Sequence, residues 1–147
     1  TDINDYRLTL AKQLGATKTI NTKKDSIKNC FDELNIKHGF DVGLEMSGNG
    51  QAFNEMLSSI YHGGKIVLLG LLPKNTYINW ENIIFKGLQV RGVYGREMYE
   101  TWYKMDQLIK SGLDLSKIIT HKFPISSFDE AFKVISSGQC GKVVMEW

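Results

Sequence analysis

Short apolar segments alternate with helical patterns through the middle of this chain. Phe40–Met46, Lys65–Leu71 and Leu88–Tyr94 have the composition of strands, and Gln51–Tyr61 and Asn79–Phe85 between them have the spacing of helices. Such alternation is typical of a parallel sheet whose strands are joined by helices. The continuous apolar character of Lys65–Leu71 also fits a parallel strand that is covered on both faces. The sequence therefore predicts an α/β fold.

The segments on either side of this region predict further helices and strands. Asn4 or Asp5 is suited to cap a helix that ends at Gly15. The other predicted elements are a short strand at Thr17–Asn21, helices at Asp25–Leu34 and Glu97–Lys110, and a tail with an extended segment at Ile118–Phe123, a helix at Ser127–Ser136 and a strand at Lys142–Trp147.

The composition is that of an ordinary globular domain. The chain has 147 residues, of which 42% are apolar and 23% charged, which is enough for one domain with a core. A net charge of +2 gives no basis for binding nucleic acid or an anionic membrane, and the apolar runs are too short to span a bilayer. Cys30 and Cys140 lie far apart and outside any ligand spacing, which argues against a disulfide framework or a zinc site. Isolated thiols fit a reducing, cytoplasmic setting.

The ends of the central strands are the first place to look for a binding site, because ligands of open α/β proteins bind at the carboxyl ends of strands. Leu69-Gly70-Leu71 ends one strand, and glycine there lets the backbone approach a flat ligand such as a carboxamide. Val93-Tyr94 ends the next strand, and Ser47-Gly48-Asn49 follows the first one. The alternatives are a simple turn at Gly70, a partly buried aromatic at Tyr94 and a helix cap at Ser47-Gly48-Asn49.

Asp2 and Arg7 form a second candidate site. A carboxylate just past a strand can accept hydrogen bonds from both hydroxyls of an adenosine ribose, which favours NAD over NADP. The alternatives are that Asp2 is a helix N-cap or a solvated acid and that Arg7 lies on a solvated helix face.

Two other groupings are rejected. Asp41 and Glu45 are four positions apart on one strand, about 13 Å at the usual rise per residue, which is too far for an acid/base pair. His38, His62 and His121 have no partner at the spacing of metal ligands.

Several segments carry a resemblance to the zinc-dependent medium-chain alcohol dehydrogenase family. The amino-acid sequence is similar in four parts of the chain, and the similarity reaches as far as Gly141-Lys142-Val143. These stretches are Thr1–Leu8, Gly39–Gly48, Gly92–Tyr103, and Ser111–Leu115 with Ile119–His121. The resemblance covers the whole chain but less than half of such an enzyme.

The resemblance implies a partial doubly wound, Rossmann-type parallel sheet that lacks its first strands. In the strand order 3-2-1-4-5-6, the segment near Ile20 corresponds to strand 3 and the three central strands to 4, 5 and 6. Strand 1 and most of strand 2 would precede Thr1, so the chain is expected to be a C-terminal piece of a longer enzyme. Residues 1–117 are expected to form the partial NAD-binding domain, and residues 118–147 a tail that returns to the missing catalytic lobe.

The resemblance also implies a function, and it is closest to family members that act on L-threonine. These enzymes oxidise the β-hydroxyl of L-threonine to give 2-amino-3-oxobutanoate with hydride transfer to NAD, and a zinc ion in the N-terminal lobe acts on the hydroxyl as a Lewis acid. Family members also join two sheets through the edge strand corresponding to Leu88–Tyr94, so a homo-oligomer, a tetramer in the parent enzyme, is expected.

The same resemblance assigns roles to individual residues. Asp2 aligns with the acid that binds the adenosine ribose and Arg7 with a second adenosine-side contact. Leu69-Gly70-Leu71 and Val93-Tyr94 align with positions whose main chain faces the nicotinamide. No residue aligns with a catalytic group or a zinc ligand, so the chain alone is expected to be inactive.

Two other functions remain open. One is oxidation of another secondary alcohol or a polyol, because substrate contacts lie mostly outside this segment. The sequences of Gly95–Met98 and Glu100–Tyr103 favour threonine as the substrate. The other is a non-catalytic association module, because the glycine-rich phosphate-binding turn of the family is not in the chain.

Overall fold

The computed structural model covers residues 1–147, and the chain divides into two compact units. One unit consists of residues 27–96, and the other combines residues 1–26 with residues 97–147. Helices and strands alternate along residues 27–96, the other unit contains both, and all three pairs of neighbouring strands are parallel. The predicted α/β class is therefore confirmed, while the domain boundary near residue 117 stays a prediction.

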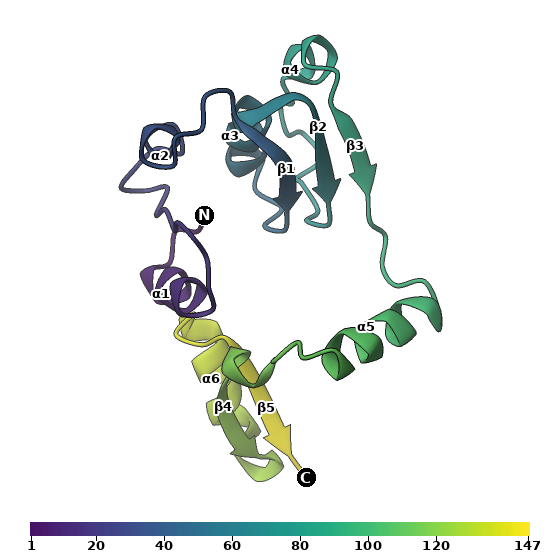
Figure 1. The fold of residues 1–147 in the computed structure, drawn as a ribbon. Helices are drawn as coiled ribbons and strands as arrows, with labels where there is room; N and C mark the ends of the chain where they lie inside the picture. Colours follow the sequence, from purple (N-terminus) through teal and green to yellow (C-terminus); the bar gives the residue numbers. More distant parts are fainter. The chain divides into compact units, whose positions relative to one another are not determined.

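Residues 27–96 form a three-stranded parallel sheet in the order β1-β2-β3. Figure 1 shows the three strands pointing the same way, with α3 against one face of the sheet. The order is that expected for three consecutive strands of one half of a doubly wound sheet. The elements are α2 (Asn29–Glu33), β1 (Phe40–Glu45), α3 (Gly50–Ser59), β2 (Ile60–Leu68), α4 (Trp80–Phe85) and β3 (Gln89–Gly92).

The core of this unit lies between α3 and the sheet. The side chain of Asn49 accepts a hydrogen bond from a backbone N–H in the first turn and so caps α3. Phe53 and Leu57, four positions apart on one side of the helix, are buried. They form one cluster with Ile60 and Ile66, so burial of apolar surface holds α3 on the sheet.

β2 begins earlier than the predicted start at Lys65. Ile60 already pairs with Phe40, and pairing resumes at Lys65 opposite Val42. The residues between, 61–64, face a single residue of β1 and form a bulge in which Gly63 has a φ of 72°. Gly63 and Gly64 therefore lie inside the strand.

All three strands end earlier than predicted. β1 ends at Glu45 rather than at 46, β2 at Leu68 rather than at 71, and β3 at Gly92 rather than at 94. At β2 the cause is visible, because the N–H groups of Leu69 and Gly70 both donate to the carbonyl of Glu45, at 2.9 and 3.1 Å, and the chain turns away. The predicted site segments therefore lie in the loops that follow the strands.

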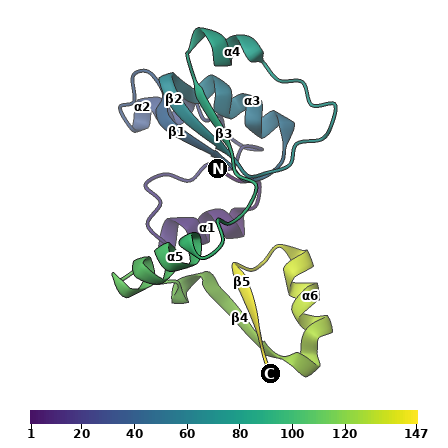
Figure 2. The ribbon, with the colours of Figure 1, turned by 90° about the vertical axis from the view of Figure 1, so that its right-hand side faces the viewer.

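In the other unit, Asn4 caps α1 (Asp5–Gln13), as predicted. Figure 2 shows the tail as two neighbouring parallel strands, β4 (Ile119–Pro124) and β5 (Lys142–Glu146), with α6 (Phe128–Ser137) alongside. The tail lies beside the start of α1, because the Asn4 amide donates a hydrogen bond of 3.0 Å to the carbonyl of Gly138. Short 3₁₀ turns at Ser116–Ile118 and Ile125–Ser127 precede and follow β4.

Three further predicted elements differ from the structure. The strand predicted at Thr17–Asn21 is reduced to one bridge between Asp2 and Asn21, since only residues around Asp2 pair with it. The helix predicted at 25–34 shrinks to α2. α5 (Glu100–Lys110) begins three residues late, because Tyr99 has a φ of 66° that a right-handed helix does not allow. No helix in the chain has the length and apolar character that crossing a membrane requires.

Candidate functional site

The loops after β1 and β2 meet through their main chains. A Cβ added to Gly70 would collide with the backbone N–H of Gly48, and a Cβ added to Gly48 would lie 2.6 Å from the carbonyl oxygen of Leu71. Gly48 also has a φ of 67°, a conformation that other residues rarely adopt. Both positions therefore require glycine, and the two loops form one surface made largely of backbone.

Glu45 is buried beneath this surface and accepts hydrogen bonds from both loops. Its side chain is 4% exposed, and the carboxylate accepts hydrogen bonds from Ser47 N at 2.9 Å, Ser47 Oγ at 2.5 Å and Gly48 N at 2.9 Å. Its carbonyl accepts the two hydrogen bonds from the β2 loop described above. Sequence reasoning considered Glu45 only as half of a rejected acid/base pair and missed this role. The available signal was a carboxylate at a strand end directly before a loop with a serine and a glycine.

The apolar residues of these loops are open to solvent. Leu71 and Tyr94 are almost fully exposed and Leu69 is about half exposed. The interpretation of Tyr94 as a partly buried aromatic is therefore wrong. Val93 donates its N–H to the carbonyl of Leu68 at 2.8 Å, which holds the start of the loop after β3 against the end of β2.

The helix-cap interpretation of Ser47-Gly48-Asn49 is confirmed for its last residue. Asn49 caps α3, and Ser47 supports it, because the Ser47 hydroxyl accepts a hydrogen bond of 3.1 Å from Asn49 N. The capping role and a role at the strand-end surface are compatible, because the cap uses the side chain of Asn49 and the surface uses the main chain of Gly48.

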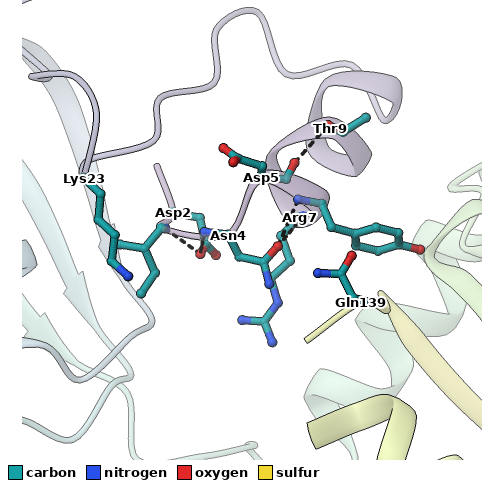
Figure 3. A pocket seen from close by; sticks show the side chains of 9 residues that line it. Asp2, Asn4, Asp5, Arg7, Thr9, Lys23 and Gln139 are labelled. Carbon is teal, nitrogen blue, oxygen red and sulfur yellow. Dashed lines mark hydrogen bonds between the residues drawn. The ribbon is translucent and has the colours of Figure 1, made fainter. Parts of the chain in front are cut away.

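Asp2 and Arg7 lie together in the unit that contains both ends of the chain. They line an open cavity of about 660 Å³, shown in Figure 3, to which Lys23 and Gln139 also contribute. The cavity offers cationic, carboxylate and amide groups, a donor and acceptor set suited to a polar ligand with hydroxyl groups. Sequence reasoning missed Gln139, and no local pattern marks it, because only the fold brings the tail to Asp2.

Asp2 is held in place from three directions. Its N–H donates to Ile20 O at 3.1 Å and its carbonyl accepts from Thr22 N at 3.2 Å. Its carboxylate Oδ1 accepts from Ile3 N at 2.7 Å and Asn4 N at 2.9 Å, and Oδ2 takes part in neither bond. Because Asn4 is the residue that caps α1, the interpretation of Asp2 as the N-cap is wrong.

The second carboxylate of the cavity, Asp5, is engaged by its neighbours. Lys24 donates to Oδ2 at 2.6 Å and Asn21 donates to Oδ1 at 2.7 Å. Hydrogen bonds from Lys24 and then Asn21 lower the pKa of Asp5 below its usual value. Asp2 and Asp5 therefore differ in how far their oxygens are already used by the protein.

The chain does not gather a metal site. No group of three or more His, Cys, Asp or Glu side chains is placed to hold a metal ion. His121 lies in β4, where its ring stacks on Phe123 with centroids 6.3 Å apart.

Comparison with known proteins connects this geometry to a family. The family model described as zinc-binding dehydrogenase matches residues 1–111. The L-threonine 3-dehydrogenase of Chromobacterium violaceum is 56% identical over 147 residues, which is all of this chain and 43% of that protein. The L-threonine 3-dehydrogenase of Proteus mirabilis is 55% identical over the same shares. The chain thus spans less than half the length of the curated relatives it matches.

The fold also matches a solved structure. The 2R,3R-butanediol dehydrogenase of Bacillus subtilis superposes with a TM-score of 0.83 at 22% identity, over 98% of this chain and 42% of that one. At this identity the match concerns the fold alone. From the family match over most of its length and the identity to relatives over all of it, the chain belongs to the zinc-binding dehydrogenase family.

Proposed function

We propose that this chain is the NAD-binding and C-terminal part of an L-threonine 3-dehydrogenase. The enzyme would oxidise L-threonine to 2-amino-3-oxobutanoate with hydride transfer to NAD. The observation that carries the proposal is the identity of 56% over the whole chain to a relative of that name. The proposed division is a partial NAD-binding domain over residues 1–117 and a tail over 118–147 that belongs to the catalytic lobe.

The residues present fit a dinucleotide at two places. Asp2 would bind the adenosine ribose, since its carboxylate is fixed by backbone N–H groups and keeps Oδ2 outside those bonds. Arg7 would contact the adenosine side from the same cavity wall.

The loops of the other unit fit the nicotinamide end. Leu69, Gly70 and Leu71 follow β2, and Val93 and Tyr94 follow β3, so their main-chain groups would orient the nicotinamide and its carboxamide. Bound NAD supplies the hydride acceptor, and these residues supply binding and orientation.

Zinc is the second cofactor of the proposed enzyme. A zinc ion polarises an alcohol as a Lewis acid when it is bound. The residues of this chain do not fit as its ligands, because they gather no group of His, Cys, Asp or Glu that could hold a metal. We assign zinc binding to the N-terminal lobe of the full-length enzyme, and we expect no turnover from residues 1–147 alone.

Turnover by the full-length protein tests whether L-threonine is the substrate. We expect NAD reduction with L-threonine at a kcat/KM at least about tenfold above that with sorbitol, because a site built for one set of polar groups rejects ligands that leave them unpaired. Equal or better use of sorbitol would identify a polyol dehydrogenase instead.

Titration of NAD into the isolated chain tests the role of the fragment. We expect binding at least about a hundredfold weaker than to the full-length enzyme, because the glycine-rich turn that holds the pyrophosphate is not in this chain. Comparable dissociation constants would show that the turn is not needed. Absence of any binding by the full-length protein would favour the association module.

We further propose a homo-oligomer, a tetramer, built on β3 and located in the cytoplasm. β3 is an edge strand of the sheet and its four residues are all exposed. Replacing Val90 by proline removes a backbone donor from this edge, so light scattering should report a smaller species for the full-length variant. An unchanged mass would exclude β3 as the interface. The cytoplasmic location rests on Cys30 and Cys140, which are both buried thiols.

A further inference from the structure

We propose that Glu45 is a positioning residue for the nicotinamide end of the bound cofactor. The inference rests on the proposed function, because it concerns the loops assigned to that end. Glu45 does not itself reach a ligand, since its side chain is 4% exposed and lies under the loop that follows β1. It acts through the main chain of both strand-end loops.

The first step is the hold on the β1 loop. Ser47 N, Ser47 Oγ and Gly48 N all donate to Oε1 of Glu45, and Gly48 N also lies 3.2 Å from Oε2. Hydrogen bonds to an ionised acceptor are roughly twice as strong as neutral ones. A buried carboxylate with these donors therefore fixes the loop, including the left-handed conformation of Gly48.

The second step carries this order to the β2 loop. The carbonyl of Glu45 accepts from Leu69 N and Gly70 N, so the same residue sets where the β2 loop leaves the sheet. The space left for a side chain at Gly70 is occupied by Glu45 Oε2 and Gly48 N, and the space at Gly48 by the carbonyl of Leu71. A shift of the Glu45 carboxylate therefore displaces Gly48 and with it the segment Leu69–Leu71.

The test uses Glu45→Gln in the full-length protein. The side chains have nearly the same shape, but the amide replaces one carboxylate oxygen by a donor that faces the N–H of Gly48. The control is Asp41→Asn, which makes the same chemical change on the same strand at an exposed position. Two ligands are titrated: NADH, and ADP-ribose, which lacks the nicotinamide.

We expect Glu45→Gln to weaken NADH about tenfold, the fold-change that corresponds to the loss of one hydrogen bond between the displaced loops and the nicotinamide end, and to leave ADP-ribose within about twofold of the unaltered protein. kcat with L-threonine should fall as well, because the nicotinamide is held less well. Asp41→Asn should change neither affinity. A purely structural role of Glu45 would lower the thermal midpoint and leave NADH binding unchanged in the folded protein, or weaken both ligands alike; either result overturns the proposal.

A second variant covers the case in which Glu45→Gln does not fold. Ser47→Ala removes the hydroxyl that donates to Oε1 and keeps the backbone, and Ser47 is exposed, so folding should be retained. It should weaken NADH more than ADP-ribose, and equal affinities to the parent would count against the proposal. If the unaltered protein binds neither ADP-ribose nor NADH, the proposed function itself is wrong. That outcome differs from one in which both ligands bind and only the role proposed for Glu45 is wrong.

Discussion

At the ends of β1 and β2 the main chain itself forms the surface, whereas around Asp2 the surface is formed by side chains. In the first region, glycines at 48 and 70 pack backbone on backbone over the buried Glu45. In the second region, charged and amide side chains line an open cavity, and the backbone serves to hold Asp2. This difference predicts whether a substitution affects mainly stability or mainly ligand recognition. Changes in the first region should alter folding and geometry together, while changes to a carboxylate of the second region that caps no helix, such as Asp2, should alter recognition with little cost in stability.

The largest effect should come from the core that holds α3 on the sheet. Leu57 of α3 is fully buried, so Leu57→Ala should lower the free energy of unfolding of the full-length protein by about 2–5 kcal/mol through lost packing and a cavity. Denaturant titration measures the loss. Leu69→Ala is the matched control, because Leu69 is half exposed in the loop and should change stability by less than about 0.5 kcal/mol. Equal losses would mean that the loop, rather than α3, carries the packing.

The next effect concerns cofactor choice in the cavity. Asp2→Asn should weaken NAD binding by about 1.5–3 kcal/mol and shift the ratio of kcat/KM for NAD over NADP towards NADP, because a charged acceptor for the ribose hydroxyls is lost. Stability should change little. Asp5→Asn is the control, since Lys24 and Asn21 already engage that carboxylate. An unchanged ratio for Asp2→Asn, or the same shift for both variants, would contradict the assignment.

Gly70→Ala probes the backbone surface directly. The added methyl group would meet Glu45 Oε2 and the N–H of Gly48, and the latter belongs to the backbone and cannot move away alone. We expect a loss of about 1–3 kcal/mol in the free energy of unfolding, as for other overpacked sites. Gly92→Ala is the control at the end of β3, where an added Cβ meets nothing within 4 Å. If the two variants were equally stable, the close contact between the loops would not exist in solution.

Features set by neighbouring residues were predictable from the sequence. The cap at Asn4, the cap at Asn49 and the strand-helix alternation depend on local hydrogen bonds and on side-chain spacing. The strand-helix alternation also placed the candidate residues at the carboxyl ends of the strands, although they lie in the loops that follow β1, β2 and β3.

Features set by distant pairing were not predictable. β2 starts at Ile60 only because Phe40 lies opposite it, and Thr17–Asn21 fails as a strand only because little of the chain pairs with it. Glu45 and Gln139 entered the candidate sites in the same way. The role of Glu45 depends on how the chain turns after the strand, and Gln139 reaches the cavity through the tail.

The smallest predicted effect concerns Asn4 in the cavity wall, which both caps α1 and donates a hydrogen bond to the tail. Its Oδ1 accepts hydrogen bonds from Tyr6 N and Arg7 N, and its amide donates to the carbonyl of Gly138. Asn4→Ala removes both and should cost about 0.5–2 kcal/mol of stability. Asn4→Asp keeps the cap and removes only the donor to the tail, so it should recover part of the loss while leaving the segment that carries Gln139 less firmly held. Denaturant unfolding measures the loss of stability, and hydrogen exchange at residues 138–141 measures how firmly the tail segment is held.

The Asn4→Asp variant should also bind ADP-ribose slightly more weakly, because Gln139 of this tail segment lines the cavity around Asp2. If Asn4→Asp matched the parent in hydrogen exchange, the contact with Gly138 would contribute nothing to the cavity, and the side-chain region would be built by the N-terminal segment alone.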